Sequence, residues 1–328
     1  MATSPLVSII CLCYKHEKYV KETLISVWEQ TYPHIEVIIV DDGSYDRSVE
    51  VIRQFLKERT APFPVKTMFL SQNVGNCKAF NQAWRSAGGK YVIDLAADDV
   101  MLPDRVEKQV AFFETLSLDY GVVFTESRYM DAQAKPLDYH FAERYRHIRP
   151  IPEGKVFCDV LSGYFISSPT MMIRNEVLAR LDGYDESLAY EDFDFWVRSA
   201  RDYRYAYLDE CTTLVRVLGQ SMSRQLYRKN DRQLFSTYRV CQKAAGMLRS
   251  SDEKRALLRR IRYEARHAVF AAKFSEASLF LELERSLKVR SFTAIFLKVL
   301  VLLRLDLSAL HRWYLSKRYG KKTAGAKK

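Results

Sequence analysis

A short apolar run near the start of the chain constrains the fold most strongly. Residues 35–40, IEVIIV, lead directly into Asp41-Asp42-Gly43-Ser44. A strand that is apolar almost throughout is typical of a parallel sheet whose two faces are both covered. The run therefore predicts a buried parallel strand whose carboxyl end opens into an acidic turn.

The first hundred residues repeat this pattern. We expect strands at 6–14, 35–40, 65–70 and 91–95, and helices over about 17–30, from Ser44 to about 59, and near 77–87. Strand–helix repeats of this length form right-handed βαβ units and a doubly wound, mostly parallel sheet. Ligands of such sheets bind beyond the carboxyl ends of the strands, where both Asp41-Asp42 and Asp98-Asp99 are predicted to lie.

The predicted secondary structure of the remaining sequence changes twice. Residues 121–219 mix predicted strands with predicted helices; we expect strands at 121–126, 205–208 and 213–218 and helices near Asn175 and Asp192. From about residue 225 the chain is helical in pattern and rich in Arg, Leu and Ala. We therefore expect an α/β domain at 1–224 and a basic helical region at 225–328.

Charge is divided unevenly along the chain. Residues 1–219 carry 25 Lys and Arg against 32 Asp and Glu, a net charge of −7, whereas residues 220–328 carry 26 against 8, a net charge of +18. Such a division predicts two surfaces with different partners.

Residues 292–322 combine dense Leu and Phe with basic residues, Trp313 and Tyr314, which favours an amphipathic helix on anionic lipid. Packing on protein, or a homo-oligomer interface, is the alternative. No nucleic-acid recognition motif accompanies the charge, so we expect no nucleic-acid partner.

The cysteine spacing and the N-terminus bear on the compartment. The six cysteines show no C-x-x-C spacing, which favours reduced thiols in a cytosolic protein. The N-terminal run lacks the features of a signal peptide, and no window holds 18 uncharged apolar residues. We expect a cytoplasmic protein that is peripheral at the inner face of the cell membrane.

Three pairs of acids are the candidate functional residues. Asp98 and Asp99 repel each other after a buried strand, and Mg²⁺ or Mn²⁺ relieves such repulsion while bridging diphosphate oxygens. Asp41 and Asp42 suit bonds to a nucleobase N–H or a ribose hydroxyl, although Asp and Ser also cap helices. Glu191-Asp192 opens an aromatic helix; it suits either the helix dipole or a general base toward a sugar hydroxyl. For the helix after Asp99, Asp104 with Glu107 predicts a capping box.

These segments together resemble the family 2 glycosyltransferases of the GT-A fold, of the bacterial polysaccharide or O-antigen type. The resemblance covers about residues 5–224 and rests on five segments in order: VSIICLCYKHEKYVKETLISVWEQTYPHIEVIIVDDGSYD, NVG, YVIDLAADDVMLPDRVEKQ, SSPTMMIRNEVLARLDGYDESLAYEDFDFWVR and VRVLGQSMS. It implies an inverting transferase that takes a sugar from a nucleotide-diphosphate donor, with UDP expected, to a glycan or lipid-linked glycan acceptor.

The resemblance also implies roles for individual residues. Asp42 would bind the base or ribose beside Asp41, and Asn73 and Gly75 would form the donor loop. Asp98 and Asp99 would hold the metal and the diphosphate. Asp192, beside Glu191, would be the general base, and residues 163–170 would lie near the acceptor.

Two departures from the family pattern affect these roles. Ala96-Ala97-Asp98-Asp99 lacks the acid that often precedes the metal pair, so the ion would be held by Asp98, Asp99, diphosphate and water. Arg216-Val217-Leu218 replaces an R-x-H motif, and Arg216 or Arg224 would neutralise phosphate instead. Both departures weaken the expected dependence on metal.

Two other classes of protein compete with this reading. A Rossmann oxidoreductase needs a glycine-rich turn after the first strand, whereas residues 14–17 are Tyr-Lys-His-Glu. A non-catalytic relative that binds glycan or membrane is the remaining alternative. The three intact acidic pairs count against it, and the missing acid and histidine count for it.

Overall fold

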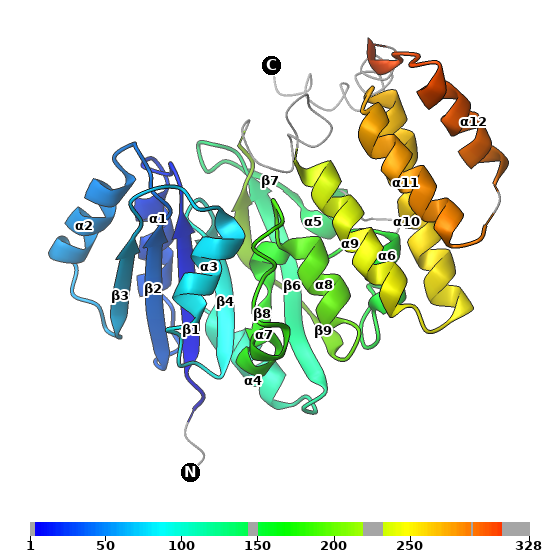
Figure 1. Cartoon of the computed structure of the whole chain (residues 1–328). Helices are drawn as coiled ribbons and strands as arrows, with labels where there is room; N and C mark the ends of the chain where they lie inside the picture. Colours follow the sequence, from blue (N-terminus) through cyan, green and yellow to red (C-terminus); the bar gives the residue numbers. More distant parts are fainter. Residues whose placement is uncertain (1–3, 144–149, 219–231, 290, 310–328) are drawn as a thin grey trace. The chain divides into compact units, whose positions relative to one another are not determined.

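The computed structural model describes residues 4–143, 150–218, 232–289 and 291–309 (Figure 1). The chain forms two compact units, residues 1–160 with 164–219 and residues 161–163 with 220–328. The predicted domain boundary at 224 falls in a segment outside the described residues, so it stays a prediction.

Within the described residues, the first unit contains one nine-stranded sheet, in the order β3-β2-β1-β4-β8-β6-β9-β5, with β7 paired to β6. The strands are β1 (Val7–Cys13), β2 (Ile35–Asp41), β3 (Val65–Phe69), β4 (Tyr91–Ala96), β5 (Val100–Met101), β6 (Tyr120–Met130), β7 (Pro136–Tyr139), β8 (Met172–Arg174) and β9 (Arg204–Arg216). The four predicted strands of the first hundred residues are confirmed as β1 to β4.

These four strands form an entirely parallel half of the sheet. Strand β1 lies between β2 and β4, so the strand order reverses at its edge. In an open α/β sheet such a reversal separates the loops that follow the strands and leaves a crevice at their carboxyl ends. The loops after β1, β2 and β4 all open there.

The other half of the sheet departs from the sequence-based prediction. Strands β8 and β5 pair antiparallel with their neighbours and were not predicted. The predicted strands at 205–208 and 213–218 are one strand, β9, which pairs with β6 in parallel. The register moves from Thr125–Leu208 to Glu126–Cys211, so Asp209 and Glu210 form a bulge. Because Asp209 and Glu210 are polar and exposed, the sequence suggested that one strand ends before them and another begins after them.

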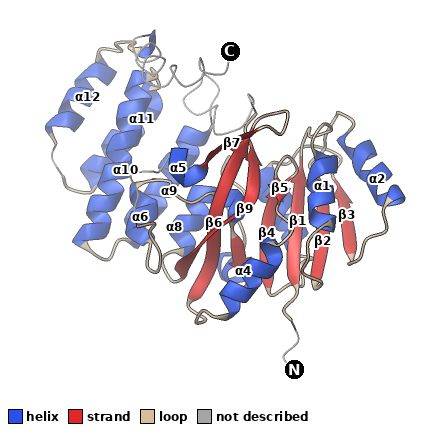
Figure 2. Cartoon of the chain, turned by 180° about the vertical axis from the view of Figure 1, so that it is seen from behind, coloured by secondary structure: helices blue, strands red, loops and turns tan. Residues whose placement is uncertain are grey.

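Helices cover both faces of the parallel half. The helices of this unit are α1 (Val20–Trp28), α2 (Ser48–Glu58), α3 (Asn76–Trp84), α4 (Arg105–Glu114), α5 (His140–Glu143), α6 (Phe157–Ser162, which ends in the second unit), α7 (Asn175–Leu181) and α8 (Asp192–Ser199), with the 3₁₀ turn η1 (Ser168–Thr170). Helices α1 and α4 lie on one face (Figure 2), and α3 lies on the other (Figure 1).

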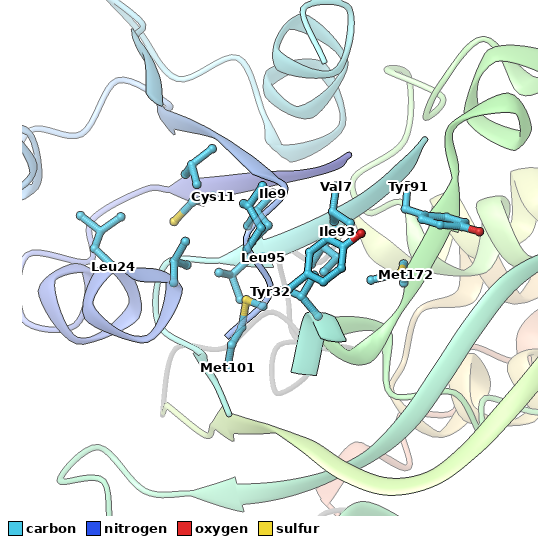
Figure 3. Packing of buried hydrophobic residues seen from close by; sticks show 14 of the residues in the cluster. Val7, Ile9, Cys11, Leu24, Tyr32, Tyr91, Ile93, Leu95, Met101 and Met172 are labelled. Carbon is cyan, nitrogen blue, oxygen red and sulfur yellow. The ribbon is translucent and has the colours of Figure 1, made fainter. Parts of the chain in front are cut away.

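The main core lies between the strands and helices α1, α2 and α4. Val7, Ile9, Ile93 and Leu95 point from β1 and β4 toward this core, where Leu24 of α1 also lies (Figure 3). Burial of each such side chain stabilises the fold by roughly 1.5–3 kcal/mol. The rigid core fixes the strand ends that carry the acidic loops.

The predicted capping box of α4 is wrong. Asp104 occupies the N-cap position but makes no capping hydrogen bond, and its carboxylate pairs with Lys108 at 2.9 Å. Glu107 instead accepts a bond from Thr31 Oγ1 at 2.6 Å. The N-cap backbone, with φ −96° and ψ 6°, does not have the extended conformation that side-chain capping prefers.

The second unit is helical, as predicted. It contains α9 (Gln233–Met247), α10 (Ser251–Phe270), α11 (Phe274–Ser286) and α12 (Phe292–Leu302), and α10 packs against the other three. No described helix combines the length and apolar character needed to cross a bilayer. Helix α12 confirms helical structure at the start of the predicted tail, whereas Trp313 and Tyr314 lie outside the described residues.

Candidate active site

The loops after β1 and β2 are joined by hydrogen bonds at the crevice. Lys15 N donates to Ser44 Oγ at 2.8 Å, and His16 N donates to Ser48 Oγ at 3.0 Å. Asp41 Oδ1 accepts from Ser44 N at 2.8 Å, while its Oδ2 is buried and has no hydrogen-bond partner. Asp41 therefore shapes the turn and retains one unused acceptor oxygen.

Asp42 holds the loop that follows β3. Its carboxylate accepts bonds from Asn73 Nδ2 at 2.9 Å, Val74 N at 2.7 Å and Gly75 N at 3.0 Å. Gly75 has φ +93°, a backbone conformation that side chains disfavour. The structure thus brings together three of the predicted donor-site residues, Asp42, Asn73 and Gly75, and gives Asp42 a positioning role within the protein itself.

Asp98 and Asp99 have different environments. Asp98 is half-buried, and Nε2 of His16 lies 3.8 Å from its Oδ2. Asp99 is only 3% exposed and accepts a bond from Arg216 N at 2.8 Å. Burial, and then the neighbouring Asp98, raise the pKa of Asp99 well above its usual range. The more accessible carboxylate of the predicted metal pair is therefore Asp98.

Arg216 does not have the free guanidinium that phosphate binding would require. It is buried, and it donates from Nε to Asp98 O at 2.9 Å and from Nη1 to Asp131 O at 3.2 Å. Its Nη2 pairs with Glu22 Oε2 at 2.5 Å. The prediction that Arg216 neutralises phosphate is wrong because its donors brace the Asp98–Asp99 loop. Arg224, the other predicted candidate, lies outside the described residues.

Glu191 and Asp192 stand at the start of α8. Asn76 Nδ2, at the start of α3, donates to Glu191 Oε2 at 2.5 Å, and Ser168 Oγ donates to Asp192 Oδ2 at 3.1 Å. Ser168 belongs to the segment predicted to lie near the acceptor, so this segment and the predicted base are adjacent. Both carboxyl groups are half-buried, which leaves them within reach of a substrate.

A third carboxyl group, Asp94 of β4, belongs to this cluster and was not predicted. Tyr184 Oη donates to Asp94 Oδ2 at 3.2 Å. Burial and the charge of Glu191 raise the pKa of Asp94 well above its usual range. A charged residue in the middle of the apolar run YVIDLA was the signal for it in the sequence. His16, Asn76 and Ser168 carried no comparable signal.

The pKa of Asp192 is raised above the ordinary carboxyl range. Burial raises its pKa well above the usual value, and the charges of Glu191 and Asp94 raise it further, while the Ser168 hydroxyl lowers it. Burial also raises the pKa of Glu191, against the Asn76 hydrogen bond. A carboxylate with a raised pKa is a stronger proton acceptor, which suits a general base.

We expect Asp94→Asn to move the pH dependence of the site. Removing this negative charge lowers the pKa of Asp192, so the acidic limb of a kcat–pH profile should shift to lower pH. A carboxyl whose pKa is raised by folding destabilises the protein as pH rises from its unfolded pKa through its raised one. Asp94→Asn should therefore also raise the Tm near neutral pH, on the order of a few degrees.

Asp94→Asn keeps an acceptor oxygen for Tyr184, so its fold should be retained. Asp182→Asn is a matched control because Asp182 is exposed, with φ 55°, a conformation that Asn tolerates. An acidic limb that stays in place in Asp94→Asn would contradict electrostatic coupling between Asp94 and Asp192.

The three acidic pairs thus line one edge of the sheet. The loop 73–76 contacts Asp42 through residues 73–75 and Glu191 through Asn76, and so joins two of them. Asp98 and Asp99 follow β4 at the same edge. Among the described residues, no three His, Cys, Asp or Glu side chains are grouped so that they could hold a metal ion. This topology, with acidic loops at the strand ends where the strand order reverses, agrees with the class that the sequence resemblance implies, the glycosyltransferases of the GT-A fold.

Comparison with known families agrees with this class. The model of the family described as "Glycosyl transferase family 2" matches residues 8–181. An uncharacterized glycosyltransferase of Methanocaldococcus jannaschii is 30% identical over 71% of this chain and 78% of its own length. The putative teichuronic acid biosynthesis glycosyltransferase TuaG of Bacillus subtilis is 31% identical over 67% of this chain and 82% of its own length. The chain belongs to glycosyl transferase family 2.

Solved structures of low sequence identity share the fold. S. aureus TarS 1–349 in complex with UDP-GlcNAc has a TM-score of 0.67 at 16% identity, covering 96% of this chain and 92% of its own. The mannosyltransferase PcManGT from Pyrobaculum calidifontis, in complex with GDP-Man and Mn²⁺, has a TM-score of 0.62 at 17% identity, covering 98% and 89%. The predicted GT-A fold is confirmed.

Proposed function

We propose that this family 2 glycosyltransferase transfers a hexose or N-acetylhexosamine from a UDP-sugar to a glycan or lipid-linked glycan during synthesis of a surface polysaccharide. The observation that carries the proposal is the Glu191–Asp192 pair, held by Asn76 and Ser168 beside the donor loop. The similarity to TuaG supports the polysaccharide context, and the UDP-GlcNAc complex of TarS supports the donor class. The cytoplasmic face of the membrane, where lipid-linked acceptors are built, is the proposed place of action.

In the proposed reaction Asp192 acts on the acceptor. Its carboxylate removes the proton of the acceptor hydroxyl while that oxygen attacks the anomeric carbon, and the bond from this carbon to the diphosphate breaks. One displacement of this kind inverts the anomeric configuration. Burial, together with the charges of Glu191 and Asp94, keeps the pKa of Asp192 raised, and the Ser168 hydroxyl donates a hydrogen bond to one of its oxygens.

A divalent cation at Asp98 would need the donor diphosphate and water as further ligands, because no group of three His, Cys, Asp or Glu side chains among the described residues could hold it. The carboxylate of Asp98 is half-buried, with His16 as its near neighbour, whereas an oxygen of Asp99 is taken by a backbone N–H. Bound Mn²⁺ or Mg²⁺ would offset the charge of the diphosphate leaving group. Arg216 holds the main chain of Asp98 in place.

A panel of nucleotide-sugars tests the donor class. We expect UDP-sugars to raise the Tm of the full chain more with Mn²⁺ than with EDTA, because a ligand that binds only the folded state stabilises it. At a ligand concentration of about 100 Kd the stabilisation is roughly 2.7 kcal/mol. GDP-mannose and ADP-glucose are the matched comparisons. Slow release of UDP without acceptor would exclude a non-catalytic relative, whereas no shift with any UDP-sugar would contradict the proposal.

A further inference from the structure

Helix α12 presents its apolar side chains outward. Leu297 and Leu300 are the two residues that it buries. Its outer stripe consists of Phe292, Ile295, Phe296, Val299, Leu302 and Leu303, all exposed, with Phe292 at 93%, Leu302 at 72% and Phe296 at 61%. Successive members lie one or three positions apart, so they form one continuous face of the helix. This face is distinct from the side that packs against α10 and α11.

Exposed basic residues flank the outer stripe in the sequence. Lys298 lies within α12 and Arg304 follows it, and both are exposed. Exposed Arg285 and Lys288 lie just before the helix in the chain, while the neighbouring exposed acids are Glu282 and Asp306. The exposed residues that flank the stripe in the sequence therefore carry an excess of positive charge, within a region of the sequence whose net charge is +18.

This combination identifies the partner by its chemistry. Large contiguous apolar faces on a protein surface mark interaction sites. The buried centres of protein interfaces are depleted of charge and of Lys in particular, whereas basic residues beside Phe and Leu are typical of helices that lie in the headgroup layer. At 11 residues, α12 is too short to cross a bilayer.

We infer that α12 docks the enzyme on an anionic lipid surface, with the outer stripe inserted among the acyl chains and Lys298 and Arg304 at the phosphates. Long basic side chains can reach the headgroups while their methylene stems remain in the apolar layer. The inference deepens the proposed function, because a lipid-linked acceptor lies in the same surface. It does not depend on catalysis.

Flotation of the full chain with vesicles tests this inference. The vesicles contain phosphatidylcholine with or without phosphatidylglycerol, and no nucleotide, metal or acceptor is added. We expect the protein to float with the anionic vesicles only, and Phe292→Ser/Phe296→Ser to lower the bound fraction by about tenfold. Leu118→Ser is the matched control, because Leu118 is 74% exposed in the first unit and should bind like the parent chain.

Two further variants distinguish the electrostatic contribution to lipid binding from the insertion of apolar side chains. Lys298→Gln/Arg304→Gln should weaken binding at low salt and reduce its salt dependence, because screened attraction to anionic lipid is lost. Phe292→Trp should show a blue-shifted emission with anionic vesicles, relative to the parent chain, because its indole enters an apolar layer. This variant reports insertion even if the double serine variant folds poorly.

Three results would overturn the inference. The first is absence of binding to anionic vesicles at low salt. The second is a Phe292→Trp emission that lipid does not change. The third is self-association of the parent chain in sedimentation velocity that Phe292→Ser/Phe296→Ser abolishes while lipid binding persists. That result would show that the stripe binds a second copy of the chain. Nucleotide-sugar binding, measured on the same preparations, tells a failure of docking from a failure of the proposed function.

Discussion

Asp192→Asn is expected to lower kcat by about 10²–10⁴ while donor affinity stays near that of the parent enzyme. The amide is isosteric with the carboxyl group but cannot accept the proton of the acceptor hydroxyl. It can still accept the Ser168 hydrogen bond, so the start of α8 should keep its geometry. Single-turnover kinetics together with nucleotide-sugar titration would measure both quantities.

The interpretation of Asp192→Asn depends on its controls. Asp182→Asn makes the same chemical change at an exposed site and should leave kcat unchanged. If donor affinity falls together with kcat in Asp192→Asn, then Asp192 belongs to the nucleotide site, and the base must be sought among Glu191 and Asp94.

Asp98→Asn is expected to lower kcat/KM by about 10²–10³, since a metal ion at a leaving diphosphate contributes several kcal/mol. The expectation follows from its half-buried carboxylate, which contrasts with the buried Asp99. UDP release should be followed across a Mn²⁺ titration and in EDTA. The parent enzyme should lose activity in EDTA, whereas the residual rate of Asp98→Asn should not change.

Asp104→Asn is the matched control for Asp98→Asn. Asp104 lies in the same loop region but pairs with Lys108 on the surface, and an exposed pair of this kind contributes little to stability. Its variant should retain both activity and metal response. An Asp98→Asn enzyme that still responds fully to Mn²⁺ would show that the cation is held elsewhere.

The parallel half of the fold was predictable because its signals are local. The run at 35–40 is apolar enough to specify a buried strand without knowledge of its neighbours, and the strand observed is Ile35–Asp41. The antiparallel half was not, because β8 has three residues and β5 has two, too few for periodicity to show. The bulge at Asp209 and Glu210 could be recognised only once the pairing of β9 with β6 was known.

The candidate site was also predictable only where its signals are local in sequence. Adjacent acids at strand ends revealed Asp41-Asp42 and Asp98-Asp99, and a helix start revealed Glu191-Asp192. The partners that orient them are remote in sequence: Asn76 lies 115 residues from Glu191, and Arg216 lies 118 residues from Asp98. No spacing rule connects such positions, so the bracing role of Arg216 was mistaken for phosphate binding.

The Arg216 brace also sets an order of assembly during synthesis. Strands β1 to β4 are complete in the chain by residue 96, whereas the arginine that holds Asp98 and Asp99 is added more than a hundred residues later. Domains fold as they emerge from the ribosome, N-terminal parts first, and contacts between distant residues form late because of the entropy of closing the intervening loop. A nascent chain that stops before β9 therefore has the strands of the parallel sheet but an unbraced acidic loop. We expect the capacity to bind a charged donor to be acquired only when residue 216 has joined the fold.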